Sequence, residues 1–95
     1  MSGCSAGGLT TFLHLDQVTP LIPSSVEKFG AVPLSGFFLD VPQLNTNYEV
    51  NMKYLFELSN STYGVDQHCT EKYSKNNEEW KCLFAPYQSD FIKTP

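Results

Sequence analysis

The chain opens on the stretch Gly3-Cys4-Ser5-Ala6-Gly7-Gly8, which has the Gly-x-Ser-x-Gly spacing of a nucleophile elbow. In such an elbow the serine sits on a sharp turn between a strand and a helix, and the flanking glycines remove side chains that would clash there. The serine hydroxyl is then exposed above the sheet, where a base can reach it. The next residue, Ala6, offers a backbone N–H to a developing oxyanion at the start of the helix. The spacing therefore predicts Ser5 as a nucleophile and Ala6 as one oxyanion-hole donor.

The rest of a serine hydrolase is not evident in the ninety-five residues. Because the elbow begins at the third residue, we expect the strand that leads into it to be missing. A hydrolase of this type needs about twice this length, since several parallel strands carry helices on both faces. A hydrophobic fraction of 41% is typical of a globular protein, and a net charge of −4 argues against nucleic acid and anionic membranes. No apolar run approaches the ~18 residues of a membrane span.

The apolar spacing predicts two helices, over 6–18 and 47–59, and a short buried strand over 29–34. The polar stretch 63–79 is predicted to be a surface loop held by a cysteine pair. The last five residues, 91–95, resemble the approach to a strand. We find no repeat, no low-complexity segment and no linker between two domains, and both ends are expected to lie within an element.

The cysteines and one short motif favour a secreted protein. Cys69 and Cys82 stand thirteen positions apart, and in an oxidising compartment a bridge between them would stabilise the fold by ~3 kcal/mol. Asn60 begins the N-glycosylation sequon Asn-Ser-Thr, which matters only on the secretory route. Cys4 is left over in the elbow. Because the residue before an elbow serine points away from it into the packing of the sheet, we predict a buried, inert thiol there rather than a nucleophile.

Taken in order, several blocks of this chain resemble the pectin acetylesterase family, which includes the palmitoleoyl-protein carboxylesterase Notum. The resemblance covers essentially the whole chain, and the Gly-Phe-Phe-Leu-Asp block narrows it most. The blocks are Ser2-Gly3-Cys4-Ser5-Ala6-Gly7-Gly8, Gly36-Phe37-Phe38-Leu39-Asp40, Cys69, Glu79-Trp80-Lys81-Cys82-Leu83-Phe84 and Ile92-Lys93-Thr94-Pro95.

The resemblance implies an α/β class and a partial α/β-hydrolase-like fold, with residues 1–95 as the central fragment of one catalytic domain, lacking strands on both sides. It implies a Ser–His–Asp triad with no metal and no cofactor, in which Ser5 matches the nucleophile and Ala6 a backbone oxyanion donor. The family's catalytic Asp and His lie downstream of the block that ends at Pro95, and its other oxyanion donors lie well upstream.

The resemblance also implies roles for residues outside the elbow. Cys69 and Cys82 match a disulfide pair, and Phe38 and Phe84 match positions near the acyl pocket of the Notum branch. Leu34 occupies a position where members of the family usually have an Asp. We therefore predict no role at this position from the resemblance.

Other interpretations of the same residues remain open. The order Ser5, Asp40 or Asp66, then His68 mimics the order of a hydrolase triad, but acid and base must converge on the serine from separate loops. We interpret Asp40 instead as satisfying backbone donors at a turn, and His68 as a solvated loop residue.

Two binding interpretations have less support in the residues. Cys69 beside His68 suggests a metal site. Zinc, however, is bound by about four ligands, and the sequence has no further candidate ligands near these two residues. A phosphate-cradling loop would need a lysine that the elbow lacks. A set of five aromatic side chains is interpreted either as the lining of a lipid or acyl pocket or as plain core: Phe37, Phe38, Trp80, Phe84 and Tyr87.

These inferences converge on a secreted or cell-wall serine carboxylesterase that removes acetyl groups from a pectin-type polysaccharide. The ninety-five residues alone are expected to lack activity, because only the nucleophile lies within them. A Notum-like protein deacylase, and a truncated homologue that binds a glycan or acyl ligand without turnover, are the alternatives. No nucleic acid partner and no membrane span are expected.

Overall fold

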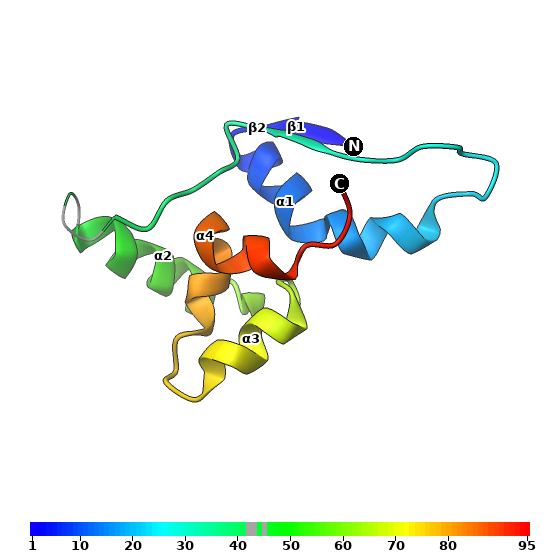
Figure 1. Ribbon diagram of the computed structural model, residues 1–95. Helices are drawn as coiled ribbons and strands as arrows, with labels where there is room; N and C mark the ends of the chain where they lie inside the picture. Colours follow the sequence, from blue (N-terminus) through cyan, green and yellow to red (C-terminus); the bar gives the residue numbers. More distant parts are fainter. Residues whose placement is uncertain (42–43, 45) are drawn as a thin grey trace.

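The computed structural model describes residues 1–41, 44 and 46–95, and the chain forms two layers of unequal size (Figure 1). A small sheet of two strands lies along the long helix α1, Ala6–Val18. The other helices, α2 to α4, form the second layer on the far side of α1 from the sheet. The two chain ends lie close together beside α1. This mixed α/β arrangement is compatible with the α/β class predicted from the sequence.

The sheet consists of β1, Ser2–Cys4, and β2, Val32–Leu34, which pair in parallel with Gly3 opposite Pro33. The prediction that no strand precedes the elbow was therefore wrong, since three residues suffice to form β1. The predicted strand over 29–34 is confirmed only in its second half, and the prediction that it is buried was wrong, because Val32 and Leu34 are exposed. Pro33 fits there because β2 bonds β1 through its neighbours: the N–H of Val32 donates to the Met1 carbonyl at 3.0 Å, and the Leu34 carbonyl accepts from Ser5 at 3.0 Å.

Helix α1 confirms the predicted span of 6–18. Its apolar face turns toward the sheet, where Gly8, Thr11 and Leu15 are buried at helical spacing. Pro20 follows the end of α1 without interrupting the helical backbone, which continues as a 3₁₀ helix. It lies in the first turn of the 3₁₀ helix η1, Thr19–Leu21. At that position a backbone N–H would have no acceptor within the helix, so proline breaks no hydrogen bond there.

Helix α2, Thr46–Leu58, confirms the second predicted helix to within one residue at each end. Helix α3, Gln67–Ser74, lies where a polar surface loop was predicted, so that prediction was wrong. The carboxylate of Asp66 caps α3 by accepting from the N–H groups of His68 at 2.8 Å and Cys69 at 3.0 Å. Asp is among the best N-cap residues, because its oxygen satisfies N–H groups that the helix leaves free.

The end of the chain is a series of short helices that leads back to α1. Two 3₁₀ helices, η3 (Glu79–Leu83) and η4 (Ser89–Phe91), flank α4 (Ala85–Gln88). The predicted approach to a strand over 91–95 is not seen as a strand. Residues 92–95 follow η4 without regular structure, and the carbonyl of Pro95 accepts from the N–H of Ala31 at 2.9 Å.

The main core lies between α2, α3, η3 and α4. It is rich in aromatic rings and includes the disulfide between Cys69 and Cys82. Its buried members are Met52, Phe56, Val65, Cys69, Trp80, Cys82, Leu83 and Phe84. The sequence also predicts an irregular stretch after Asp40, and residues 42, 43 and 45 of that stretch lie outside the described residues.

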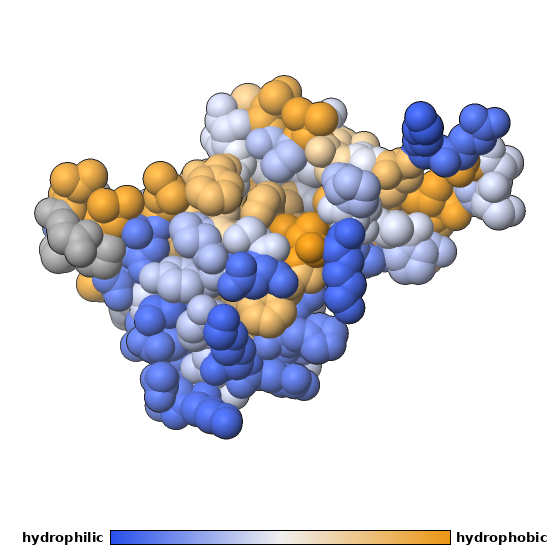
Figure 2. Space-filling model, viewed as in Figure 1, coloured by the Kyte–Doolittle hydropathy of each residue, from blue (hydrophilic) through white to orange (hydrophobic). Residues whose placement is uncertain are grey.

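The surface divides by polarity in Figure 2, where hydrophilic residues cover α3 and orange patches lie over α2 and the strands. Exposed apolar side chains on α2 include Val50, Tyr54, Leu55 and Leu58, and β2 exposes Val32 and Leu34. Within residues 1–41, 44 and 46–95, no helix has both the length and the apolar character to cross a bilayer.

Candidate functional site: a serine on a strained turn between strand and helix

Ser5 occupies the turn between β1 and α1 in a backbone conformation that serine rarely adopts. Its φ is 54° and its ψ is −117°, in a region where a Cβ atom crowds the backbone. Such a residue costs of order 1–3 kcal/mol and persists only where its surroundings hold it. Two hydrogen bonds do so: the N–H of Ser5 donates to Leu34 at 3.0 Å, and its carbonyl accepts from Leu9 at 2.9 Å.

Close backbone packing fixes the position of the turn against the sheet. A Cβ atom added to Gly3 would lie 2.2 Å from the carbonyl oxygen of Gly7. One added to Gly8 would lie 2.5 Å from the carbonyl oxygen of Leu34. Only glycine permits these contacts, so the glycines of the elbow bring the start of α1 directly onto β1 and the end of β2. Gly7 differs, because a Cβ there would meet nothing within 4 Å.

The polar groups at the turn are free to act on a ligand. Ser5 is exposed, and its side chain does not cap α1. The hydroxyl makes no hydrogen bond to any residue that the structure describes. The first N–H groups of a helix have no partner within the helix, and at Ala6 and Gly7 they belong to exposed residues. An exposed hydroxyl beside uncapped helix N–H groups suits nucleophilic attack with stabilisation of a negative oxygen.

Neither histidine acts on Ser5 in this structure. His14 lies in α1, where its Nδ1 is 3.0 Å from the side-chain oxygen of Gln17. His68 is in the first turn of α3 with its side chain 70% exposed, and its Nδ1 is 3.5 Å from Asp66. It is thus solvated as predicted, although in a helix rather than a loop. The described residues therefore do not assemble a triad around Ser5.

Asp40 has a partner other than the one predicted. Rather than satisfying backbone donors at a turn, its Oδ2 accepts a hydrogen bond of 2.7 Å from the hydroxyl of Tyr87, on α4. That bond, together with burial and the charge of Asp40, raises the pKa of Tyr87 to about 12. The second oxygen of Asp40, Oδ1, is buried without a partner among the described residues. The pair ties the segment after β2 to the aromatic core.

Asp16 joins α1 to the end of the chain. Its carboxylate accepts from the N–H of Lys93 at 2.8 Å, the N–H of Thr94 at 2.9 Å and the hydroxyl of Thr94 at 2.6 Å. The Thr94 hydroxyl also lies 2.8 Å from that of Thr19. Burial acts to raise the pKa of Asp16, but the bonds from Thr94 and Lys93 outweigh it and hold the pKa below its ordinary value. Sequence reasoning missed this contact because its partners are far apart along the chain.

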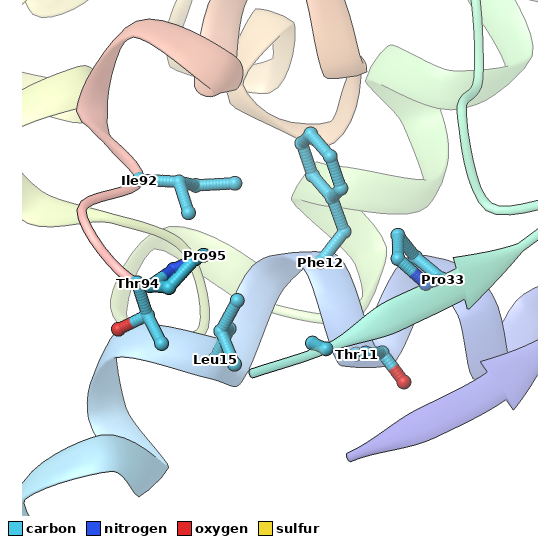
Figure 3. A pocket seen from close by; sticks show the side chains of 8 residues that line it. Thr11, Phe12, Leu15, Pro33, Ile92, Thr94 and Pro95 are labelled. Atoms are coloured by element: carbon cyan, nitrogen blue, oxygen red, sulfur yellow. The ribbon is translucent and has the colours of Figure 1, made fainter. Parts of the chain in front are cut away.

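An apolar cavity of about 160 Å³ lies between α1, β2 and the last residues (Figure 3). Leu15 and Phe12 project into it from α1, with Ile92 and Pro95 opposite them and Pro33 at one side. Ser5 is not among its lining residues. The cavity is thus a gap in the packing of α1 against the chain end rather than a pocket at the serine.

The two phenylalanines that the resemblance placed near an acyl pocket lie in or against the core. Phe84 is 0% exposed, with its ring edge-to-face against Trp80, Tyr48 and Tyr87 at centroid distances of 5.9, 5.8 and 6.5 Å. Phe38 is partly buried against the same cluster, and its carbonyl accepts from the N–H of Ala85 at 3.1 Å. Their substrate-binding role stays a prediction.

The cysteines and the sequon are also placed. Cys69 and Cys82 form the disulfide and are fully buried. Cys4 is exposed, so the prediction of a buried thiol was wrong. Gly3 faces α1, and because side chains alternate along a strand, Cys4 faces the other side, which no described element covers. Asn60 is exposed after the end of α2 in the left-handed conformation, with φ 51° and ψ 47°, which asparagine tolerates better than most residues.

A strained, exposed serine lies between a parallel strand and a helix, with glycines at the contacts, and this is the backbone geometry that a nucleophile elbow requires. Comparison with known proteins gives the family. The pectinacetylesterase family matches residues 1–95, and the chain belongs to it.

Individual relatives agree with this assignment at low identity. The chain is 31% identical to pectin acetylesterase 5 of Arabidopsis thaliana, 29% to pectin acetylesterase 4 and 25% to pectin acetylesterase 11 of the same plant. Each match covers 100% of this chain but only 22%, 22% and 24% of the relative. The chain therefore spans under a quarter of the length of these relatives. No solved structure matches it.

Proposed function

We propose that this chain carries the nucleophile of a carboxylic ester hydrolase that removes acetyl groups from a pectin-type polysaccharide. The observation that supports this most is the conformation of Ser5, held at positive φ between β1 and α1 with its hydroxyl exposed. Membership of the pectinacetylesterase family supports the reaction class and the substrate. Residues 1–95 would be the central part of a single α/β-hydrolase-like catalytic domain.

The proposed reaction is a two-step acyl transfer. The Ser5 hydroxyl oxygen attacks the ester carbonyl carbon while its proton passes to a histidine supplied from outside these residues. The resulting oxyanion accepts a hydrogen bond from the N–H of Ala6, a contribution of ~3 kcal/mol by analogy with single-donor deletions. The ester C–O bond then breaks, and the sugar oxygen leaves with the proton. Water hydrolyses the acetyl-serine to acetate and free serine.

Labelling with a serine-directed fluorophosphonate tests the role of Ser5. In the full-length enzyme we expect the label on Ser5 and its loss in Ser5→Ala. Ser35→Ala is a matched control, because Ser35 is also exposed and also has a positive φ, of 50°. Labelling elsewhere, with Ser5 unmodified, would refute the nucleophile.

The isolated ninety-five residues are proposed to be inactive as an esterase. His14 lies beside Gln17 and His68 beside Asp66, so the residues that the structure describes place no histidine where it could accept the proton of Ser5. Turnover of p-nitrophenyl acetate by this polypeptide, abolished by Ser5→Ala, would contradict that.

We also propose that the protein is secreted, or is placed in the cell wall, and carries a glycan on Asn60. The buried disulfide and the exposed sequon support this, since each has its usual role on the secretory route. Thr62→Ala removes the sequon without changing Asn60, so loss of a glycosidase-sensitive mass shift in that variant would support the site. The same shift in Thr62→Ala would contradict it.

A further inference from the structure

The end of α2 exposes two large apolar side chains beside the sequon. Leu58 is 81% exposed and Tyr63 is 80% exposed, two residues before and three residues after Asn60. Tyr63 closes the 3₁₀ helix η2, Ser61–Tyr63, of which Asn60 is the N-cap. Three residues make one turn of such a helix, with a rise of roughly 6 Å. A group attached to Asn60 is therefore close to both apolar side chains.

The backbone of Asn60 is used by the fold, but its side chain is not. Asn60 follows α2 in the left-handed conformation, and its N–H donates to the carbonyl of Glu57 at 3.2 Å. Asparagine is one of the few residues that adopt this conformation readily at a helix end. Its side chain does not cap η2 and makes no hydrogen bond to any residue that the structure describes. The amide is thus available for modification while the backbone around it is held.

The ring of Tyr63 is not used by the aromatic core. Tyr48, Tyr73 and Tyr87 each lie edge-to-face against another ring. Within the part of the chain that the structure describes, Tyr63 has no such neighbour and lies under no cation. An exposed, flat aromatic surface suits the C–H face of a sugar ring, since both surfaces are apolar and leave water on contact.

We propose that the first N-acetylglucosamine of a glycan on Asn60 packs its C–H face against the ring of Tyr63, with Leu58 at its edge. This inference rests on the glycan at Asn60 proposed above. Attachment replaces one hydrogen of the amide nitrogen by a bond to C1 of the sugar. The bond from C1 to a glycosyl diphosphate donor breaks, and the diphosphate leaves with the proton.

The glycan itself decides which group covers this surface. An N-linked glycan is bulky and stays at the surface of the protein. Another protein segment over Leu58 and Tyr63 would have to occupy the space of the sugar that Asn60 carries. The covalent bond also holds the sugar at a high effective concentration beside the ring, so a weak contact is enough to keep it there.

A thermodynamic cycle in the full-length glycosylated protein tests this contact. Thr62→Ala removes the glycan and keeps the backbone carbonyl that accepts from Nε2 of Gln67 at 3.1 Å. Tyr63→Ser removes the ring. We expect the glycan to raise the folding equilibrium constant about two- to tenfold when Tyr63 is present, the size of an aromatic stacking contact. It should have little effect in Tyr63→Ser. Urea unfolding of the four proteins provides the measurement.

Matched controls separate the contact from other effects of the substitutions. Thr62→Ser retains the sequon and should retain the effect of the glycan. Tyr54→Ser removes another exposed tyrosine, on α2, and should leave that effect unchanged. Trimming the glycan enzymatically to its first sugar should also leave it unchanged, because that sugar makes the contact. Enzymatic removal of the whole glycan from the folded protein gives the same comparison if Thr62→Ala is not secreted.

An equal effect of the glycan with and without the ring of Tyr63 would overturn the proposal. A dimer of the glycosylated protein that Tyr63→Ser dissociates, seen by sedimentation, would assign the surface to a second copy and would overturn it as well. In both cases the mass shift that reports the glycan persists, so the proposed glycan would stand. Absence of that mass shift would refute the glycan and the contact together. None of these outcomes depends on labelling at Ser5.

Discussion

Gly8 of α1 and Gly36, two residues beyond β2, meet backbone to backbone. A Cβ atom on Gly36 would lie 2.3 Å from the carbonyl carbon of Gly8, and one on Gly8 would lie 2.9 Å from the Cα of Gly36. No side chain can move aside at such a contact, because both partners are main chain. The start of α1 is therefore held against the segment that leads to Phe37 and Phe38, and this contact fixes the angle of the elbow.

Gly8→Ala should destabilise the protein, and Gly7→Ala should not. The alanine at position 8 would clash with the Leu34 carbonyl at 2.5 Å, and overpacking of this kind costs about 1–3 kcal/mol. Position 7 is open, and alanine is the better helix former by roughly 0.5–1 kcal/mol. Urea unfolding of both variants checks this. Equal stabilities would show that the close contact is not maintained in solution.

Replacing Ser5 by glycine should separate stability from chemistry. Glycine adopts positive φ without penalty, so Ser5→Gly should be more stable than Ser5→Ala, which keeps the strain, by about 1 kcal/mol. Both variants lack the hydroxyl and should lose fluorophosphonate labelling. Thermal unfolding midpoints of the two variants provide the measurement. A less stable glycine variant would mean that the turn is not strained as described.

Removal of the disulfide should cost about 3 kcal/mol. The bridge closes a sequence separation of 13 and is fully buried in the aromatic core. The double substitution Cys69→Ala with Cys82→Ala should lower the free energy of unfolding by that amount. Cys4→Ser is the control, since an exposed thiol adds little to the core. If Cys4→Ser lowers the free energy of unfolding as much as the double variant does, the loss of stability does not come from removal of the buried bridge.

Stability should depend on pH through Asp16. Because hydrogen bonding holds its pKa in the folded state below the ordinary 3.8, it contributes stability above that pH, and the contribution is lost as pH falls through the folded pKa. Asp16→Asn should therefore be less stable than the parent at pH 6, by about 1–2 kcal/mol for weakened hydrogen bonds. The difference should shrink below pH 4. A constant difference from pH 2 to 7 would rule out a contribution from ionised Asp16.

Tyr87 should ionise later than the other tyrosines. The hydrogen bond to Asp40 raises its pKa to about 12, whereas burial alone raises the pKa of Tyr48, so an ultraviolet titration should contain a last phenol that Tyr87→Phe removes. The same substitution leaves the Asp40 carboxylate without its donor and should cost about 1–3 kcal/mol. If Tyr87→Phe removes an ordinary phenol near pH 10 instead, the bond to Asp40 does not form.

The local features of this fold were predictable from the sequence. The glycine spacing around Ser5 predicted the turn before α1, although the strand that leads into it was expected to be missing, and the apolar period predicted α1 and α2 closely. Both signals are carried by residues near one another in the chain, where sterics and helical spacing act directly. The cap of α3 was also predictable, since Asp66 precedes the helix, but the polar composition of the segment favoured a loop.

Contacts between distant segments could not be predicted in this way. Asp16 accepts hydrogen bonds from Lys93 and Thr94 only because the folded chain brings these distant residues together. The same holds for the bond from Tyr87 to Asp40. Nothing in the local pattern of either aspartate indicates its partner. The sequence by itself therefore determined the turn at Ser5, the helices α1 and α2 and the family. The tertiary structure decided which carboxylates are used by the fold, that Phe84 lies in the core and that Cys4 is exposed, because burial and hydrogen bonding depend on how far segments pack together.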